Sequence, residues 1–436
     1  MAQPMTLEAG AEGANAPEGA SALWGRPSLR LSVLFGVLVC VGVVMVTSAA
    51  GTAGRGGDVF TRVLVRRLTW TALGLVAFAA GLTVDYQSWR RHHMAIGALA
   101  FLVLALVLVA GTEINGARRW LRFGSSIGVQ PSEFAKVALI IWMAAYCERC
   151  VWKRHPHKGG PMMRTVTWGL LVPGAVAGAA SLLVLLEPDF GAAALIGALC
   201  VGVMLVCGAW LLYVPLGITA ALPLVVQKLI IDEPYRLQRV LTFLNPWHDP
   251  DGTGYQLIQS MIAIGSGGLT GKGLGMGVQK LGFVPASAND FIFSILAEEL
   301  GFVGGMVVLA IYGWILWEGL KVALRARDTF GFALAFGLTS LIGLQAALNI
   351  AVVTGSVPTK GLSLPLVSAG GSSLFMTLWA AGILVNIARS EETPSRVELT
   401  PWYTDIPAYE HTLRATSRKA LARAHALLTS ELGRKR

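Results

Sequence analysis

A single carboxylate, Asp290, lies in the stretch FVPASANDFIF, where a glycine-rich segment gives way to a long apolar helical pattern. It is the only acidic residue between Asp251 and Glu298. A carboxylate can act as a general base when it lies beside the proton that it removes. It is also favoured at a helix N-terminus by ~0.3–1 kcal/mol through the helix dipole, which is a sufficient structural reason for its position. Other residues must decide between these two explanations.

The segment NGARRWLRFGSSIGVQPSEFAK combines basic residues with one acid. Arg118, Arg119 and Arg122 precede Glu133 and Lys136, which are three residues apart and therefore share one face of a helix. Two interpretations remain open. The pair is an intrahelical ion pair that neutralises itself, or it belongs to a basic outer cavity in which the carboxylate orients one lysine.

Two further segments contain isolated cations. In PYRLQRV, Arg236 and Arg239 are three residues apart and would share one face of a short helix. That arrangement suits phosphate binding, although an ion pair with the neighbouring acid Asp232 or Glu233 explains it equally well. Lys360, in TGSVPTKG, has no acid close to it in the sequence. A lysine that extends its ammonium group to the membrane surface is the plain alternative.

The stretch LLEPDFGAA ends an apolar segment with Glu187 and Asp189, which fits an acidic turn at a membrane surface. Ionisable groups inside a membrane cost ~2.5–3.5 kcal/mol each at a helix centre, so these groups need a reason. Several cations with very few candidate bases suit an anionic, lipid-attached substrate whose phosphates lie at headgroup level.

The elements that must position these residues are membrane helices. Of the 436 residues, 54% are hydrophobic and 14% charged, and the mean hydropathy is +0.61, too high for a soluble protein of this size. A bilayer span needs ~20 apolar residues. We expect an all-α polytopic membrane protein with ten spans, which begin near Leu31, Leu68, Met94, Glu133, Val166, Gly191, Leu211, Asp290, Phe330 and Pro365.

Loop charges predict the orientation. Lys and Arg number 21 in the N-terminal tail, the even-numbered loops and the C-terminal tail, against 13 in the odd-numbered loops. Both termini are therefore expected in the cytoplasm. We divide the chain into a disordered tail (1–28), a transmembrane domain (29–388) with a large outer loop at about 230–289, and a cytoplasmic tail (389–436). The first apolar run is long for a signal peptide. The formal charge of +10 is spread over many loops, which argues against nucleic-acid binding.

The large outer loop is expected to fold back as short helices and re-entrant turns, because sixty structureless residues are improbable in a compact protein. Within it, YQLIQSMIAI has an apolar face suited to the membrane interface. GSGGLTGKG resembles a phosphate-binding loop but lacks the first glycine and the final Ser or Thr. We expect its glycines to allow tight packing.

Metal binding is not demanded by any residue cluster. The pair Cys147 and Cys150 in CERC has ligand-like spacing, but no second Cys or His pair accompanies it. We predict no certain cofactor, with a divalent cation left open.

Many motifs in order resemble the SEDS family (shape, elongation, division and sporulation), over roughly Leu31 to Asn386. They are NGARRWL, QPSEFAK, EPDFG, PYRLQRV, NPW, GYQLIQS, GSGG, VQKLGFVP, DFIFSILAEELG, TGSVPTKGL and LPLVSAGGSS. EPDFG and PTKG favour the division-type branch over the elongation-type branch. Two local departures are PASAN before the acid and Ala369 before the paired glycines.

The resemblance implies a ten-span peptidoglycan glycosyltransferase of the bacterial inner membrane, at the division septum. Such an enzyme polymerises lipid II on the outer leaflet, works with a class B penicillin-binding protein and other division proteins, and contacts membrane lipids. The resemblance also places the essential acid at Asp290. The matching substrate-binding positions are Arg119, Glu133, Lys136, Arg236, Arg239 and Lys360.

The proposed reaction needs few residues. A lipid diphosphate is already a good leaving group, so the enzyme needs positive charge to stabilise it and one base for the acceptor hydroxyl. A glycosidase, by contrast, needs two carboxylates. Two other classes remain as alternatives: a lipid II flippase that makes no bonds, whose charges would lie at the midplane, and a scaffold that recruits division proteins.

Overall fold

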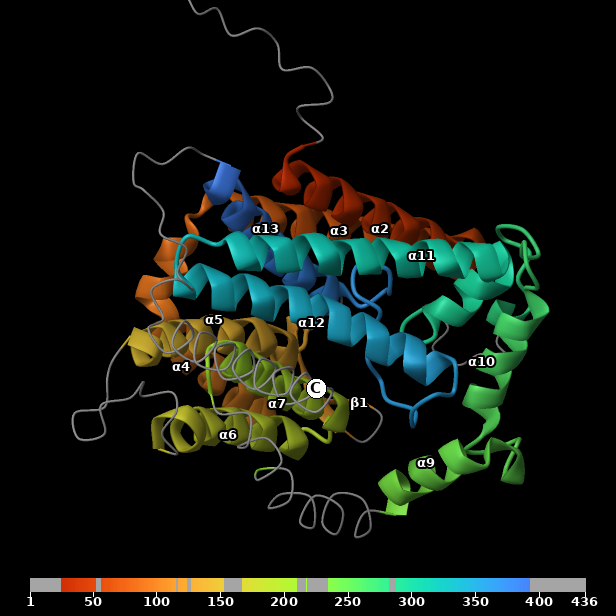
Figure 1. The fold of residues 1–436 in the computed structure, drawn as a ribbon. Coiled ribbons are helices and arrows are strands. Elements are labelled where there is room, and N and C mark those ends of the chain that lie inside the picture. Colours follow the sequence, from red (N-terminus) through yellow and green to blue (C-terminus); the bar gives the residue numbers. More distant parts are fainter. Residues whose placement is uncertain are drawn as a thin grey trace, which may run out of the picture.

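The computed structural model describes residues 25–51, 56–114, 117–123, 127–152, 167–209, 217, 234–281 and 288–392. Within these ranges the chain is mostly helical (Figure 1). The helices are α2 (Pro27–Gly51), α3 (Gly56–Thr83), α4 (Tyr86–Ala110), α5 (Pro131–Trp152), α6 (Val172–Leu186), α7 (Phe190–Val206), α9 (Pro234–Leu244), α10 (Tyr255–Ser266), α11 (Ile292–Arg325), α12 (Thr329–Val353) and α13 (Gly371–Glu392).

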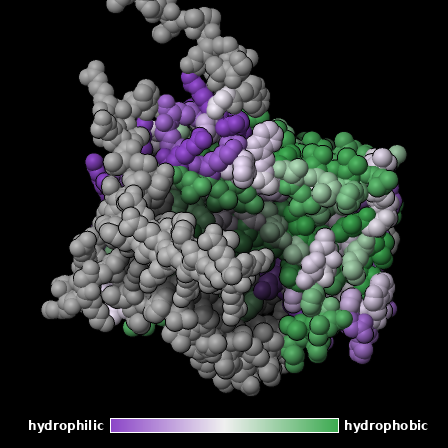
Figure 2. Space-filling view, viewed as in Figure 1, coloured by the Kyte–Doolittle hydropathy of each residue, from purple (hydrophilic) through white to green (hydrophobic). Residues whose placement is uncertain are grey.

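The membrane assignment is confirmed. Seven of the described helices are long and apolar enough to cross a bilayer, and α7 is apolar but shorter. Helix α5 has the length of a span and carries charged residues near both ends. Nine of the ten predicted spans thus correspond to a described helix, and the seventh, expected from about Leu211, lies outside the described residues. Figure 2 shows hydrophobic side chains over much of the described face, with hydrophilic ones gathered where α2 begins and α13 ends.

Two helices begin earlier than hydropathy predicts. Helix α3 starts at Gly56 and α4 at Tyr86, so their first turns are polar. Asp85 explains the second start, because its side chain accepts a hydrogen bond from the backbone N–H of Gln87 and caps α4. Because α3 starts at Gly56, Arg67 lies about three turns inside the helix and is buried in the bundle, where hydropathy assigns a loop.

The two ends of the transmembrane domain meet. The backbone N–H and Oγ of Ser28, at the start of α2, each donate to the carboxylate of Glu392, at the end of α13, both at 2.8 Å. Helices α3 and α13 approach at their backbones, because a Cβ at Gly382 would lie 2.2 Å from the carbonyl oxygen of Phe78. The first and last helices therefore expose their free ends on one side of the bundle, the side predicted to be cytoplasmic.

The loop between α4 and α5, on the opposite side, contains structure that the all-α expectation omits. Strands β1 (Thr112–Ile114), β2 (Ala117–Phe123) and β3 (Ile127–Val129) form an antiparallel three-stranded sheet in chain order. Alternation along β2 directs Arg119 to the face opposite Arg118 and Trp120. The sheet therefore determines that Arg119, rather than Arg118, points toward the helices.

Helix α11 is broken near its start. Gly301 has φ 70° and ψ −171°, so residues 292–300 form a short helix that folds back beneath the long part, residues 302–325 (Figure 1). The span predicted from Asp290 therefore begins only after this break. The short helix re-enters the bundle. Asp290, which precedes its N-terminus, is therefore turned toward the bundle interior.

The glycine-rich segment of residues 265–281, here called the glycine run, supplies hydrogen-bond partners to the backbone at the break in α11. Backbone N–H groups of Lys272 and Gly273 donate to the carbonyls of residues 298 and 299, both at 3.0 Å. The N–H groups of residues 302 and 303 donate back to the carbonyls of residues 268 and 269 at 2.9 and 3.1 Å. Gly271, Gly273 and Gly275 all have positive φ. The run thus satisfies backbone groups that a membrane would leave unpaired, which confirms the tight-packing interpretation of its glycines.

Candidate catalytic site among the outer loops

Asp290 lies in the turn that precedes α11, and two neighbouring segments hold the backbone of that turn. Asn349 of α12 donates from Nδ2 to the carbonyl of Asp290 at 2.7 Å and to that of Leu362 at 2.6 Å. One buried amide therefore ties the turn to the loop between α12 and α13. An acid whose backbone is fixed in this way needs little reorganisation before it reacts.

The same loop binds the turn a second time. Ser368 donates from Oγ to the carbonyl of Asn289 at 2.6 Å, and the N–H of Ala369 donates to the carbonyl of Ala288 at 2.9 Å. The loop itself is held by Arg67 of α3, whose guanidinium donates to the carbonyls of Ser368 and Leu366. Ala288 and Asn289, the described end of the PASAN departure, thus lie across one hydrogen-bonded contact from the other departure, Ala369.

The electrostatic setting of Asp290 favours its protonated form more than water does. Burial, followed by the nearby carboxylate of Asp189, raises the pKa of Asp290 to about 6, while Arg239 and Arg119 act in the opposite direction. A Cβ at Gly361 would lie 3.1 Å from the Oδ2 atom of Asp290, so the loop passes close to the carboxylate. A pKa near 6 suits a group that must accept a proton close to neutral pH.

Arg119 reaches from β2 to the turn between α6 and α7. Its Nε donates to the carbonyl of Glu187 at 2.9 Å and its Nη2 to that of Pro188 at 2.7 Å. The turn is also shaped by Asp189, which accepts from the N–H of Ala192 at 3.0 Å and caps α7. Guanidinium has five N–H donors, so this anchoring leaves Arg119 further donors for a ligand.

Glu187 is fully buried beside this anchor, and neither of its carboxylate oxygens accepts a hydrogen bond from the described residues. Burial and then Asp189 raise the pKa of Glu187 to about 8, against the opposing effect of Arg119. Glu187 is therefore a protonated, neutral acid at pH 7. The turn in LLEPDFGAA, which the sequence predicts to be acidic, therefore contains one uncharged acid, Glu187.

The other cations enter from the loops on either side. Arg239, on α9, donates from Nη1 to the carbonyl of Thr359 at 3.1 Å. The adjacent Lys360 has its Nζ 4.5 Å from the ring centroid of Phe190, at the start of α7, and burial lowers its pKa. Arg236 belongs to α9, but its side chain lies outside the described residues.

Glu133 and Lys136 form a buried ion pair of 2.8 Å on α5. The pair is more than self-neutralising, because Lys136 also donates from Nζ to Oε1 of Gln345 on α12 at 3.0 Å. Gln345 in turn donates to the carbonyl of Ser363 at 3.0 Å. The pair is thus connected to the loop that also contacts the Asp290 turn.

The structure brings most of the predicted residues together in two groups. Arg119 and Arg239 act electrostatically on Asp290, and Lys360 packs on Phe190, the residue after Asp189. Glu133 and Lys136 form a separate buried group, which Gln345 connects to the loop between α12 and α13. Glu298 and Glu299 lie outside the site, because they bind Lys272 and Lys280 of the glycine run.

Sequence reasoning missed the residues that hold the site in place. Gln345 and Asn349 are buried amides four residues apart on the apolar helix α12, a spacing that places both on one face. Polar side chains in an apolar span need partners, so this pattern was a usable signal. Arg67 had no such signal, because hydropathy assigns it to a loop.

Comparison with known proteins identifies the family. The family described as "Cell cycle protein", which comprises FtsW, RodA and SpoVE, matches residues 29–393. A protein named probable peptidoglycan glycosyltransferase FtsW from Alkalilimnicola ehrlichii is 41% identical over 84% of this chain and 90% of its own length. Stage V sporulation protein E of Bacillus subtilis is 36% identical over 83% of this chain and 97% of its own.

Solved structures agree with these relatives. A chain from a peptidoglycan synthase complex, reported to coordinate polymerization and crosslinking, has a TM-score of 0.67 at 31% identity and covers 85% of this chain and 98% of its own. Thermus thermophilus RodA, a rod shape determining protein, has a TM-score of 0.61 at 27% identity with the same coverage. The chain therefore belongs to the FtsW/RodA/SpoVE family, as its SEDS motifs predict.

Proposed function

We propose that this protein is a division-type peptidoglycan glycosyltransferase that polymerises lipid II at the outer leaflet of the bacterial inner membrane, at the septum. The observation that carries the proposal is the position of Asp290. Its turn is fixed by α12 and the last outer loop, its pKa is near 6, and Arg119 and Arg239 act on it. The names of the relatives support the reaction class.

In the proposed mechanism, Asp290 removes the proton from the acceptor 4-hydroxyl as that oxygen attacks the anomeric carbon of the donor. The carbon–oxygen bond to the lipid diphosphate breaks on the opposite face, so the configuration inverts. General base catalysis of this kind contributes ~10²–10⁴ in rate. One base is sufficient because the diphosphate leaves without protonation.

The cations would divide the two lipid diphosphates between them. Arg119, Arg239 and Lys360 lie on outer segments around the Asp290 turn, where they can stabilise the negative charge of the departing diphosphate. Lys136 is already engaged by Glu133 and Gln345, so we assign it to positioning the loop. Arg236 keeps its predicted role in substrate binding.

The partner is proposed to be a class B penicillin-binding protein, with other division proteins at the septum. One neighbour of known structure is a chain of a peptidoglycan synthase complex, which supports such an assembly. The partner would crosslink the glycan strands as they form.

The decisive experiment measures glycan polymer from lipid II with the purified protein and its transpeptidase. Asp290→Ala should lower the rate by ~10²–10⁴, because the base is lost. Asp251→Asn, an exposed acid in the same outer loop, is the matched control and should polymerise normally. If Asp290→Ala keeps processive polymerisation, the assignment of Asp290 is wrong.

A translocation assay separates the flippase alternative. Vesicles containing the protein and labelled lipid II would report transfer between leaflets independently of polymer. Translocation without any glycan polymer from the wild-type complex would overturn the glycosyltransferase proposal.

A further inference from the structure

Arg67 is a buried cation to which the proposed mechanism assigns no role. It lies on α3 with 3% of its surface exposed. Its Nη1 donates to the carbonyl of Ser368 at 2.5 Å, and its Nη2 donates to the carbonyls of Leu366 at 2.8 Å and Val367 at 3.4 Å. Three consecutive carbonyls of the last outer loop therefore converge on one guanidinium, whose planar fork of donors suits such a set.

The face of α3 that carries Arg67 also packs against the end of this loop. Trp70 is three residues further along the helix and is therefore on the same face. A Cβ at Gly371, where α13 begins, would lie 2.3 Å from the ring of Trp70, so no side chain fits between them. Ser368 and Ala369 lie in the chain between these two contacts. Helix α3 therefore determines the position of both residues.

The backbone of the loop is strained where Arg67 binds it. Leu366 has φ 66°, in the left-handed region that residues with a side chain rarely adopt. The carbonyl of the preceding Pro365 accepts a hydrogen bond from Oη of Tyr312, on α11, at 2.5 Å. Strained backbone of this kind persists only where the surrounding structure holds it, and it clusters at functional sites. Arg67 and Tyr312 supply that constraint from two helices.

The strained loop is bonded to the backbone beside the proposed base. Ser368 accepts from Arg67 at its carbonyl and donates from Oγ to the carbonyl of Asn289 at 2.6 Å. Asn289 immediately precedes Asp290. The same Oγ accepts from the N–H of Leu364 at 2.8 Å, which fixes the direction of the hydroxyl. A shift of Ser368 would therefore reach the backbone of the base through one hydrogen bond.

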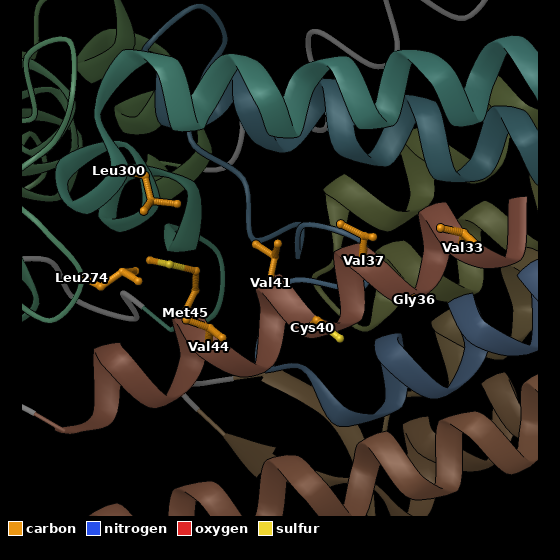
Figure 3. Close-up of a pocket in the computed structure, with 9 residues that line it drawn as sticks. All are labelled: Val33, Gly36, Val37, Cys40, Val41, Val44, Met45, Leu274 and Leu300. Carbon is orange, nitrogen blue, oxygen red and sulfur yellow. The ribbon is translucent and has the colours of Figure 1, made fainter. Parts of the chain in front are cut away.

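Helix α2 leaves space for the contact between Arg67 and the loop. A Cβ at Gly42 would lie 2.4 Å from Nη2 of Arg67 and 2.5 Å from the carbonyl oxygen of Leu366. A methyl group there would have to move both the guanidinium and the loop backbone. Gly36, on the same helix, instead lines the apolar pocket shown in Figure 3, and its Cβ would meet no atom within 4 Å. The two glycines thus provide a perturbation of the contact and a matched control.

We infer that Arg67 is a positioning residue of the reaction, which acts through Ser368 to hold the Asp290 turn in its reactive geometry. This inference rests on the proposed function. In this role Arg67 does not contact the substrate: its guanidinium fixes the loop, and the loop fixes the base. Because a misplacement of about 1 Å can cost ~10²-fold in rate, loss of the contact should lower kcat.

Arg67→Lys keeps the charge but lacks the planar fork that matches the three carbonyls. With lipid II and the complex of the protein with its transpeptidase, kcat per folded protein should fall by on the order of 10–10²-fold. KM should stay close to the wild-type value, since Gln345 and Asn349 separately hold the part of the loop next to Lys360. Arg66→Lys, at the exposed preceding residue, is the matched control and should keep both constants.

Gly42→Ala tests the same contact without removing a polar group. Its kcat should fall in the same way, whereas Gly36→Ala should match the wild type. Hydrogen exchange at the N–H groups of Leu364 and Ala369, which are bonded within the loop and to the Asp290 turn, should become faster in Gly42→Ala and Arg67→Lys. Mass spectrometry of peptides from this loop measures the exchange without turnover, and thermal melting in detergent measures the folded fraction.

The pH profile separates positioning from a loss of folded protein. Burial is the main reason that the pKa of Asp290 is about 6. A looser turn admits water to the carboxylate, so the acid limb of kcat/KM should move to lower pH in Arg67→Lys. A smaller folded fraction would lower the whole profile without moving it.

Two results would overturn the inference. If the loop exchanges faster in both variants while kcat per folded protein and the pH profile are unchanged, Arg67 has only a structural role. If kcat falls without faster exchange, Arg67 does not act through the loop. Faster exchange in both variants, with no polymer from the wild-type complex, would support the contact and overturn only the proposed function.

Discussion

At the scale of single residues, the candidate site depends on which acids are charged. Asp290 has a pKa of about 6 and Glu187 one of about 8, although both lie beside the same arginine, Arg119. Burial is the main cause in both cases, and Asp189 adds to it. At neutral pH Asp290 is mostly ionised and Glu187 is mostly protonated. Of these two acids, Asp290 is the one able to accept a proton at neutral pH, which supports its assignment as the base.

The pH dependence of polymerisation follows from this assignment. The active form of Asp290 is the carboxylate, so kcat/KM should be constant above about pH 7 and fall as the pH drops through about 6. An unperturbed aspartate would place the same fall near pH 4. Initial rates of polymer formation between pH 4.5 and 8, with a check that the protein stays folded, would measure it. A profile flat down to pH 5 would contradict the expected pKa.

At the scale of elements, the break in α11 explains how an acid next to an apolar helix reaches the site. An unbroken helix would start α11 at the membrane surface. The positive φ of Gly301 instead turns residues 292–300 back into the bundle, and the glycine run pairs the freed backbone groups. Glu299 and Glu298 add side-chain bonds to the same run. The glycines and the two glutamates therefore act together to stabilise the break in α11.

Gly301→Ala should destabilise the break in α11. The backbone conformation of Gly301 is essentially restricted to glycine, and an added Cβ would lie 2.2 Å from the backbone N of Gly271. We expect a loss of at least ~2–3 kcal/mol in the free energy of unfolding, measured by thermal melting in detergent. Gly313→Ala, in the same helix with open space around it, should melt like the wild type.

At the scale of the whole molecule, the site and the chain ends lie on opposite sides of the bundle. Ser28 and Glu392 meet on one side, whereas β1–β3, the Asp290 turn and the loop before α13 lie on the other. Chain ends on the same side of the bundle agree with an even number of spans. The loop charges predict that the site faces the outside, which is the side that the proposed function requires.

Cysteine labelling in intact cells tests this orientation. In a Cys40→Ser background the four remaining native cysteines are buried. Thr270→Cys, exposed in the glycine run, should react with a membrane-impermeant maleimide added outside. Val84→Cys, exposed in the turn between α3 and α4, should react only after permeabilisation. The reverse pattern would invert the topology and contradict an outer catalytic site.

The sequence by itself determined the membrane class, the family and the identity of most candidate residues. These follow from hydropathy, which reports the solvent of each segment, and from short motifs that are local in the chain. It also predicted that the glycine run packs tightly, since glycine is the residue for positive φ. Residues 27–28 and 389–392, assigned to the tails from the sequence, belong to helices α2 and α13. The seventh span, Arg236 and the rest of both tails remain predictions, because they lie outside the described side chains.

Only the tertiary structure decided which residues meet. Asn349, Gln345 and Arg67 act on segments far away in the sequence, and no local pattern encodes such partners. The protonation of Glu187 is likewise a consequence of burial, which depends on packing between α6, α7 and the sheet. The break at Gly301 needs both the helix and the loop that pairs with it. Local sequence specifies the chemistry available, and long-range packing specifies where each group stands and how it is charged.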